Sequence, residues 1–98
     1  MKSPRVSIII SAYNAMKYLP ATVNSVLQQS FSNFEVLIFN NGSSDNIVQW
    51  FQCLRDLRCK LISQQYLGIF ETRNLGISEA RGEYVAFLDA DDLWHPRK

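Results

Sequence analysis

Apolar residues gather into four short stretches along this chain, at residues 5–11, 35–40, 60–63 and 83–88. Each stretch has the length of a strand, and the first contains the run Val6-Ser7-Ile8-Ile9-Ile10. Short, nearly continuous apolar runs are typical of strands that are buried on both faces of a sheet. We therefore predict four strands that share one sheet.

Between the first three stretches the apolar residues change to helical spacing. The first helix is indicated by Leu19, Val23, Val26 and Leu27, and Pro20 is tolerated in its first turn. The second helix is indicated by Ile47, Phe51 and Leu54. Ser44 or Asp45 is expected to cap this second helix, because short polar side chains accept hydrogen bonds from the first free backbone N–H groups.

A third helix is predicted over residues 68–81. Gly82 follows it directly, where a helix commonly ends in a left-handed conformation that suits glycine. Within the helix, Thr72, Gly76 and Ala80 lie four residues apart on one face. These small side chains should let the helix approach the sheet closely.

Strands that alternate with helices indicate an α/β protein with a mainly parallel sheet, covered by helices on both faces. Right-handed crossovers place the C-terminal ends of the strands on one edge, where ligands bind in sheets of this kind. The residues at these strand ends are therefore the candidates for a site. They are Ala12, Tyr13 and Asn14 at the first strand, Asn40 and Asn41 at the second, and Asp89 and Asp91 at the fourth.

The composition indicates a single globular domain and argues against some classes of partner. With 98 residues, of which 47% are hydrophobic and 19% charged, residues 1–98 have the size of one globular domain. The formal net charge of +1 argues against a nucleic-acid partner or a polybasic membrane patch. No apolar run approaches the ~20 residues of a membrane span, and no signal-peptide core follows Met1. We therefore expect a cytoplasmic protein.

Cysteine and histidine form no recognisable motif. Cys53 and Cys59 lack the spacing of a zinc site or of a redox pair, so we expect two reduced, partly buried thiols. His95 is the only histidine. Without partners to orient it, His95 is expected to be structural or exposed to solvent.

Three carboxylates crowd together at the end of the fourth stretch: Asp89, Asp91 and Asp92. Their mutual repulsion would be relieved by a divalent cation, and Mg²⁺ or Mn²⁺ prefers such oxygen ligands. A solvated turn is the alternative, because aspartate is common in turns. The chain has neither of the two common glycine-rich phosphate loops. A cation on Asp91 is therefore the expected binding group for a phosphate.

Several short motifs follow one another along the chain: VSIIISAYN at 6–14, SVLQQSF at 25–31, NGSSD at 41–45, RNLG at 73–76, ARGEY at 80–84 and LDADDLW at 88–94. In this order they resemble the N-terminal part of the family 2 glycosyltransferases with the GT-A fold. The resemblance implies a Rossmann-like, three-layer α/β/α fold. It also implies transfer of a sugar from a nucleotide-diphosphate sugar, most commonly a UDP-sugar, to an acceptor saccharide or a lipid-linked glycan, as in the synthesis of cell-envelope polysaccharide.

The resemblance assigns roles to the first two loops. Tyr13 would stack on the nucleobase or close over it, although an aromatic residue here also suits the packing of the loop. Asn40 stands where the family has an Asp that accepts a hydrogen bond from the base, so the interaction loses its charge assistance. Ala12 replaces the usual Pro, which loosens the loop that carries Tyr13 and Asn14. Asn41 begins the second loop.

The same resemblance assigns roles near the end of the chain. Arg73 would contact the base or the phosphates of the donor, the alternative being an ordinary surface arginine of a helix. Asp89 and Asp91 would form the D-x-D motif, with Asp91 on the cation and Asp89 on the ribose or on the metal through water. The cation would bridge the diphosphate and stabilise the charge that develops on the leaving group.

Catalytic domains of this family continue beyond the D-x-D motif, and in inverting members the later half supplies the general base. The resemblance therefore implies that no catalytic base lies before Lys98. It also implies that the chain is the donor-binding half of a metal-dependent, inverting enzyme. The full-length enzyme would be cytoplasmic, and peripheral at the inner face of the membrane if it attaches there as some relatives do. The alternative is a non-catalytic module that binds a nucleotide weakly or a partner. In both cases we expect the isolated chain to self-associate or to be marginally stable, because its sheet edge is uncovered.

Overall fold

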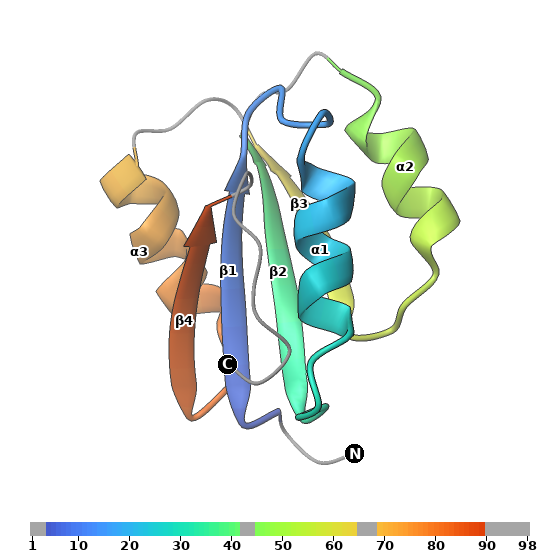
Figure 1. Ribbon diagram of the computed structural model, residues 1–98. Helices are drawn as coiled ribbons and strands as arrows, with labels where there is room; N and C mark the ends of the chain where they lie inside the picture. The colour runs from blue at the N-terminus through green and yellow to red at the C-terminus, as the bar shows by residue number, and fades with distance from the viewer. Residues whose placement is uncertain (1–3, 42–44, 65–68, 90–98) are drawn as a thin grey trace.

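The computed structural model describes residues 4–41, 45–64 and 69–89. Four strands and three helices alternate along these residues (Figure 1). The strands are β1 (Val6–Ala12), β2 (Phe34–Asn41), β3 (Cys59–Gln64) and β4 (Tyr84–Asp89). The helices are α1 (Leu19–Leu27), α2 (Ile47–Leu54) and α3 (Ile69–Glu79). The predicted order of elements is confirmed, and their bounds differ from the prediction by one or two residues.

The four strands form one parallel sheet in the order β3-β2-β1-β4. The register places Ile10 of β1 beside Ile38 of β2 and Leu88 of β4. One step further along, Ser11 lies beside Phe39 and Asp89. The C-terminal ends of the three strands therefore reach the same edge of the sheet, as the α/β prediction requires.

The helices lie on both faces of the sheet, with α1 and α2 on one face and α3 on the other (Figure 1). The first face buries the larger core, in which Ile8, Ile10, Val23, Val26, Val36, Ile38 and Ile47 are at most 1% exposed. The second face buries Ile9, Leu37 and Phe39 with Leu75 and Ala80. This division follows the period of two along β1 and β2, where successive side chains point to opposite faces.

The small-residue face of α3 is packed closely on β1, as predicted. A Cβ atom at Gly76 would lie 2.7 Å from Cγ2 of Ile9. Thr72, one turn earlier on the same face, is fully buried. A larger residue at Gly76 would therefore push the helix away from the sheet.

The predicted role of Gly82, as a left-handed residue that ends the third helix, is wrong. Gly82 does not adopt the left-handed conformation, and α3 already ends at Glu79. A Cβ atom at Gly82 would instead lie 2.6 Å from the backbone nitrogen of Ser7. Glycine is required here because two segments of backbone pass each other in close contact.

A buried polar network joins the N-terminal ends of the strands. The Ser7 hydroxyl donates to Glu35 at 2.5 Å, and the backbone N–H of Arg81 donates to the same carboxylate at 2.8 Å. Ser7 Oγ in turn accepts the N–H of Gly82 at 2.8 Å. Glu35 is only 3% exposed. Burial alone would raise the pKa of Glu35, but the hydrogen bonds from Ser7 and Arg81 outweigh it, so that the pKa is lowered.

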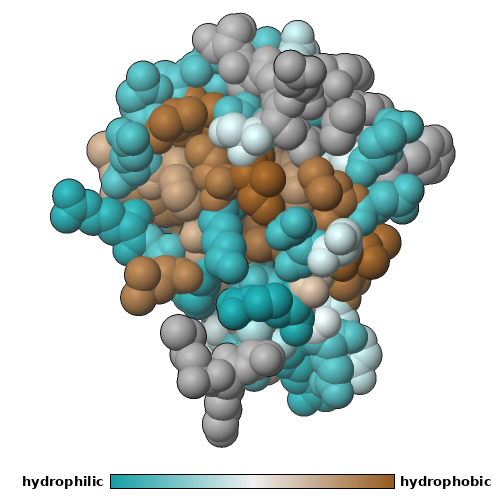
Figure 2. Space-filling view, turned by 180° about the vertical axis from the view of Figure 1, so that it is seen from behind, coloured by the Kyte–Doolittle hydropathy of each residue, from teal (hydrophilic) through white to brown (hydrophobic). Residues whose placement is uncertain are grey.

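The outer strand β4 is only partly covered by the described residues, as expected for the sheet edge. Tyr84, Val85 and Phe87 are 58%, 37% and 43% exposed. Val85 and Phe87 lie opposite Ser7 and Ile9 of β1, which places them on the face of α3. Figure 2 shows this face, where apolar side chains gather in the middle and polar ones surround them.

The two cysteines differ from one another. Both are free thiols, but Cys59 is buried whereas Cys53 is exposed, so the prediction of two partly buried thiols holds only for Cys59. Burial raises the pKa of the Cys59 thiol to about 12. Within the described part of the chain, none of the helices is both long and apolar enough to cross a membrane.

Candidate functional site

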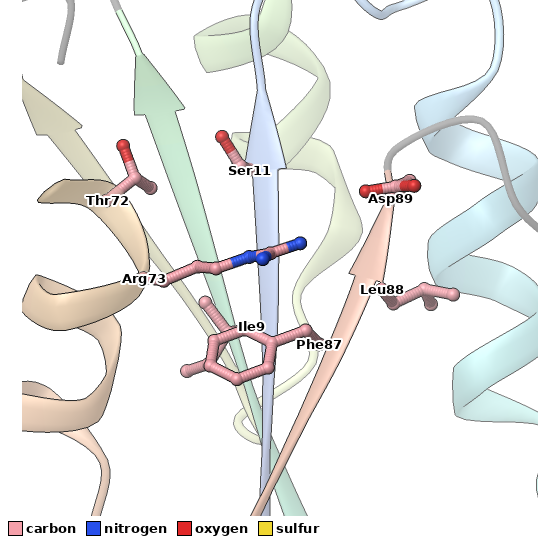
Figure 3. A pocket seen from close by; sticks show the side chains of 7 residues that line it. All are labelled: Ile9, Ser11, Thr72, Arg73, Phe87, Leu88 and Asp89. Carbon is pink, nitrogen blue, oxygen red and sulfur yellow. The ribbon is translucent and has the colours of Figure 1, made fainter. Parts of the chain in front are cut away.

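A small cavity opens at the C-terminal edge of the sheet, between α3, β1 and β4 (Figure 3). Its volume is about 20 Å³. The lining residues are Ile9, Ser11, Thr72, Arg73, Phe87, Leu88 and Asp89. Two of the residues that the sequence proposed, Arg73 and Asp89, therefore meet at one place although they come from different elements.

Arg73 crosses from α3 toward the sheet, and its guanidinium lies over the ring of Phe87 (Figure 3). The distance from Cζ to the ring centroid is 5.3 Å, which is within the range of a cation–π interaction. The aromatic ring thus supports the charged group at the edge of the sheet. Phe87 was not among the predicted site residues, because its place in an apolar strand gave no signal beyond packing.

Asp89 is the last residue of β4 and is exposed. Its position opposite Ser11 brings a carboxylate to the end of β1. Asp91, Asp92 and His95 lie outside the described residues, and so does the metal site expected on Asp91. No group of three metal-ligating side chains is present within residues 4–41, 45–64 and 69–89.

The first loop presents an aromatic ring to solvent. Tyr13 is 56% exposed directly after β1, and Asn14 follows it with a φ of 49°. Asparagine adopts this left-handed conformation more readily than most residues. Ala12 is fully buried in the larger core, so its methyl group packs on the face of the sheet that α1 and α2 cover.

The end of β2 is more buried than the loop after β1. Asn40 and Asn41 are 7% and 4% exposed. The side-chain amide of Asn40 donates to the hydroxyl of Ser63 on β3 at 3.3 Å. This bond fixes Asn40 against the neighbouring strand, and its role in binding a base stays a prediction.

Asp45 links the first loop to the start of α2. Its Oδ2 accepts the backbone N–H of Met16 at 3.2 Å, and its Oδ1 accepts the N–H of Ile47 at 3.3 Å. The N-cap residue of α2 is Asn46, so the predicted cap is displaced by one residue, although Asp45 does accept one of the first N–H groups of the helix. Ser44 lies outside the described residues. The bond to Met16 was not predicted, because it joins residues that are distant in the sequence.

Thr72 is a further residue that the sequence did not place in the site. It was assigned to the small-residue face of α3, and its side chain is indeed fully buried. Its hydroxyl nevertheless lines the cavity and has no hydrogen-bond partner among the described residues. No pattern in the sequence distinguishes such a hydroxyl from one that is satisfied.

The chain resembles known proteins in both sequence and fold. Residues 7–98 match the family described as glycosyl transferase family 2. The chain belongs to this family, and its α/β fold is of the GT-A type found in the structures that it resembles.

One similar relative is WfgD of Escherichia coli, a UDP-Glc:alpha-D-GlcNAc-diphosphoundecaprenol beta-1,3-glucosyltransferase. It is 39% identical over 94 residues, which make up 95% of this chain and 37% of WfgD. The structure of S. aureus TarS residues 1–349 in complex with UDP superimposes with a TM-score of 0.86 at 31% identity, over 95% of this chain and 29% of that one.

A third similar protein is the mannosyltransferase PcManGT of Pyrobaculum calidifontis, whose structure contains GDP-Man and Mn²⁺. It superimposes with a TM-score of 0.82 at 26% identity, over 96% of this chain and 29% of that one. This chain therefore spans well under two thirds of the length of each of these relatives.

Proposed function

We propose that the chain is the donor-binding part of a glycosyltransferase. The enzyme transfers a sugar from a nucleotide-diphosphate sugar, a UDP-sugar in the first instance, to an acceptor saccharide or lipid-linked glycan. The observation that supports this proposal most directly is the meeting of Arg73 and Asp89 in one cavity at the strand ends. Similar proteins that bind UDP or act from UDP-glucose favour uridine as the base.

The exposed ring of Tyr13 is available to stack on the nucleobase. The guanidinium of Arg73 presents a planar set of N–H donors that suits the carbonyl groups of a base or the oxygens of a phosphate. Both groups lie at strand ends or beside them, and the fold keeps this edge free of the helices that cover the two faces.

We also propose that a divalent cation binds at this site. The exposed carboxylate of Asp89 is a suitable oxygen ligand for Mg²⁺ or Mn²⁺, and Asp91 would be the second. When bound, such a cation neutralises the diphosphate and stabilises the charge on the leaving group. The transfer is proposed to invert the configuration of the sugar, with a general base outside this chain.

Calorimetry of UDP binding to the 98-residue chain tests the proposal. We expect Mn²⁺ to tighten UDP binding, and we expect EDTA, Asp89→Ala or Asp91→Ala to remove that gain. Equal affinity in Mn²⁺ and in EDTA would exclude the role of the cation. Absence of any UDP binding would overturn the proposal as a whole.

Tyr13→Ala tests the contact with the base, and Tyr84→Ala is its matched control. Tyr84 is 58% exposed, close to the 56% of Tyr13, but it lies at the opposite end of the sheet. Tyr13→Ala is expected to weaken UDP binding, while Tyr84→Ala leaves it unchanged. Equal effects of both substitutions would contradict the assigned site.

A further inference from the structure

Thr72 carries a buried hydroxyl that none of the described residues uses. The side chain is fully buried, and within the described part of the chain its Oγ has no hydrogen-bond partner. A hydroxyl that is buried without a partner costs about 1–3 kcal/mol of stability. Close packing of α3 requires only a small side chain at this position, because Ala80 meets the same requirement two turns later. Packing therefore does not explain the hydroxyl.

The cavity beside Thr72 has the size of a single small group. A volume of about 20 Å³ accommodates one water-sized group. In Figure 3 the hydroxyl oxygens of Thr72 and Ser11 both point toward the C-terminal edge of the sheet. One exocyclic atom of a nucleobase that rests on this edge would fit between them.

The polar groups of the cavity favour an oxygen over an amino group. Arg73 offers only N–H donors, whereas the hydroxyls of Thr72 and Ser11 can donate as well as accept. A carbonyl oxygen would accept from these groups, whereas an amino group would place its own hydrogens against the donors of Arg73. Among the described side chains of the lining, Asp89 is the one obligate acceptor, and it is exposed to water.

We propose that the Thr72 hydroxyl donates a hydrogen bond to an exocyclic carbonyl oxygen of the donor's nucleobase and makes the site prefer a keto base over an amino base. This inference rests on the proposed function, because it assigns a further contact within the donor site. UDP and CDP are the decisive pair of ligands, since uracil carries an oxygen where cytosine carries an amino group. Thr72 thereby contributes to the choice of base.

Calorimetry with UDP and CDP, together with thermal unfolding, tests the role of Thr72. Thr72→Val keeps the shape of the side chain but removes the hydroxyl. We expect it to weaken UDP binding about threefold to tenfold, as the loss of one hydrogen bond implies. The preference for UDP over CDP should shrink, and the melting temperature should stay equal or rise, because a hydroxyl without a partner is removed.

Thr72→Ser and Thr72→Ala provide the second comparison, which remains informative if valine disturbs the packing. These two variants differ by the hydroxyl alone, and only the serine variant is expected to retain the preference for UDP. Unchanged UDP binding in Thr72→Val, or equal losses for UDP and CDP, would overturn the inference while leaving the proposed function intact. A wild-type chain that binds no UDP would overturn the proposed function itself.

Discussion

The Ser7 hydroxyl donates a hydrogen bond of 2.5 Å to the buried carboxylate of Glu35, across the pair of strands β1 and β2. Arg81 completes the arrangement through its backbone N–H and its guanidinium, which lies 3.3 Å from Oε1 of Glu35. This network ties the segment between α3 and β4 to the centre of the sheet. It lies at the opposite end of the strands from the cavity lined by Arg73 and Asp89, so we expect it to serve the fold.

Stability should therefore fall in acid through Glu35. The pKa of Glu35 is lowered in the folded chain relative to its ordinary value of 4.5, so protonation favours the unfolded state. The stabilising contribution is complete above pH 4.5 and is lost as the pH falls through the pKa of the folded state. Glu35→Gln is expected to cost about 1–3 kcal/mol at neutral pH and progressively less below pH 4.5.

Urea unfolding of both proteins between pH 3 and pH 7 measures this difference. Glu83→Gln is the control, because Glu83 forms only an exposed ion pair with Arg5 at 3.9 Å. Its substitution should change stability little at any pH. A difference between the wild type and Glu35→Gln that stays constant over this range would show that the ionisation of Glu35 does not matter.

Removing the ring beneath Arg73 should weaken ligand binding without unfolding the chain. An exposed cation–π interaction contributes about 0.5–1 kcal/mol, so Phe87→Leu is expected to reduce UDP affinity about twofold to fivefold. Phe87→Tyr keeps the aromatic face and should retain the affinity. The change is measured by calorimetry at low ionic strength.

The same strand offers a matched control for Phe87. Arg5 lies 5.7 Å from the ring of Tyr84, at the other end of β4. Tyr84→Leu removes that pair and should leave UDP affinity unchanged. If Phe87→Leu and Tyr84→Leu had the same effect, the position of Arg73 over Phe87 would be irrelevant to binding.

The two glycines that contact β1 should tolerate alanine unequally. At Gly82 the added Cβ would meet the backbone of Ser7, whereas at Gly76 it would meet the side chain of Ile9. Overpacking costs about 1–3 kcal/mol, but alanine within a helix recovers up to about 1 kcal/mol at Gly76. Gly82→Ala is therefore expected to be the more destabilising substitution by urea unfolding, and the reverse order would refute this reason for glycine at position 82.

Loss of the Asp45 side chain should loosen two segments together. Asp45→Ala removes the bonds to the N–H groups of Met16 and Ile47 and is expected to cost about 0.5–2 kcal/mol. Asp45→Asn keeps one accepting oxygen and should lie between the alanine variant and the wild type. Hydrogen exchange at Met16 and Ile47 provides the local measurement, and unchanged exchange at Met16 in Asp45→Ala would contradict the link.

The elements of this fold could be predicted because local patterns specify them. The run around Ile9 and the helical spacing from Leu19 to Leu27 depend only on neighbours in the sequence. The sequence also indicated Arg73 and Asp89, which the structure brings to one cavity. Their roles in binding stay predictions.

What could not be predicted depends on contacts between distant residues. Gly82 was interpreted as a helix terminus because glycine is common there, but its real constraint is the backbone of Ser7. Glu35 was included in an apolar strand, and its partners became visible only with the register of β1 and β2. The hydroxyl of Thr72 belongs to the same class, since only three-dimensional packing shows that its partners are missing among the described residues.

The pairing of Ser11 with Asp89 joins the first strand of the chain to the last described one. The cavity that Ser11 and Asp89 line therefore forms only when β4 is paired with β1. A nucleotide bound in this cavity would stabilise the pairing of β4 with β1 and slow the exchange of the amide hydrogens of β4. If the proposed function holds, nucleotide binding and the pairing of β4 with β1 are thermodynamically linked, each favouring the other.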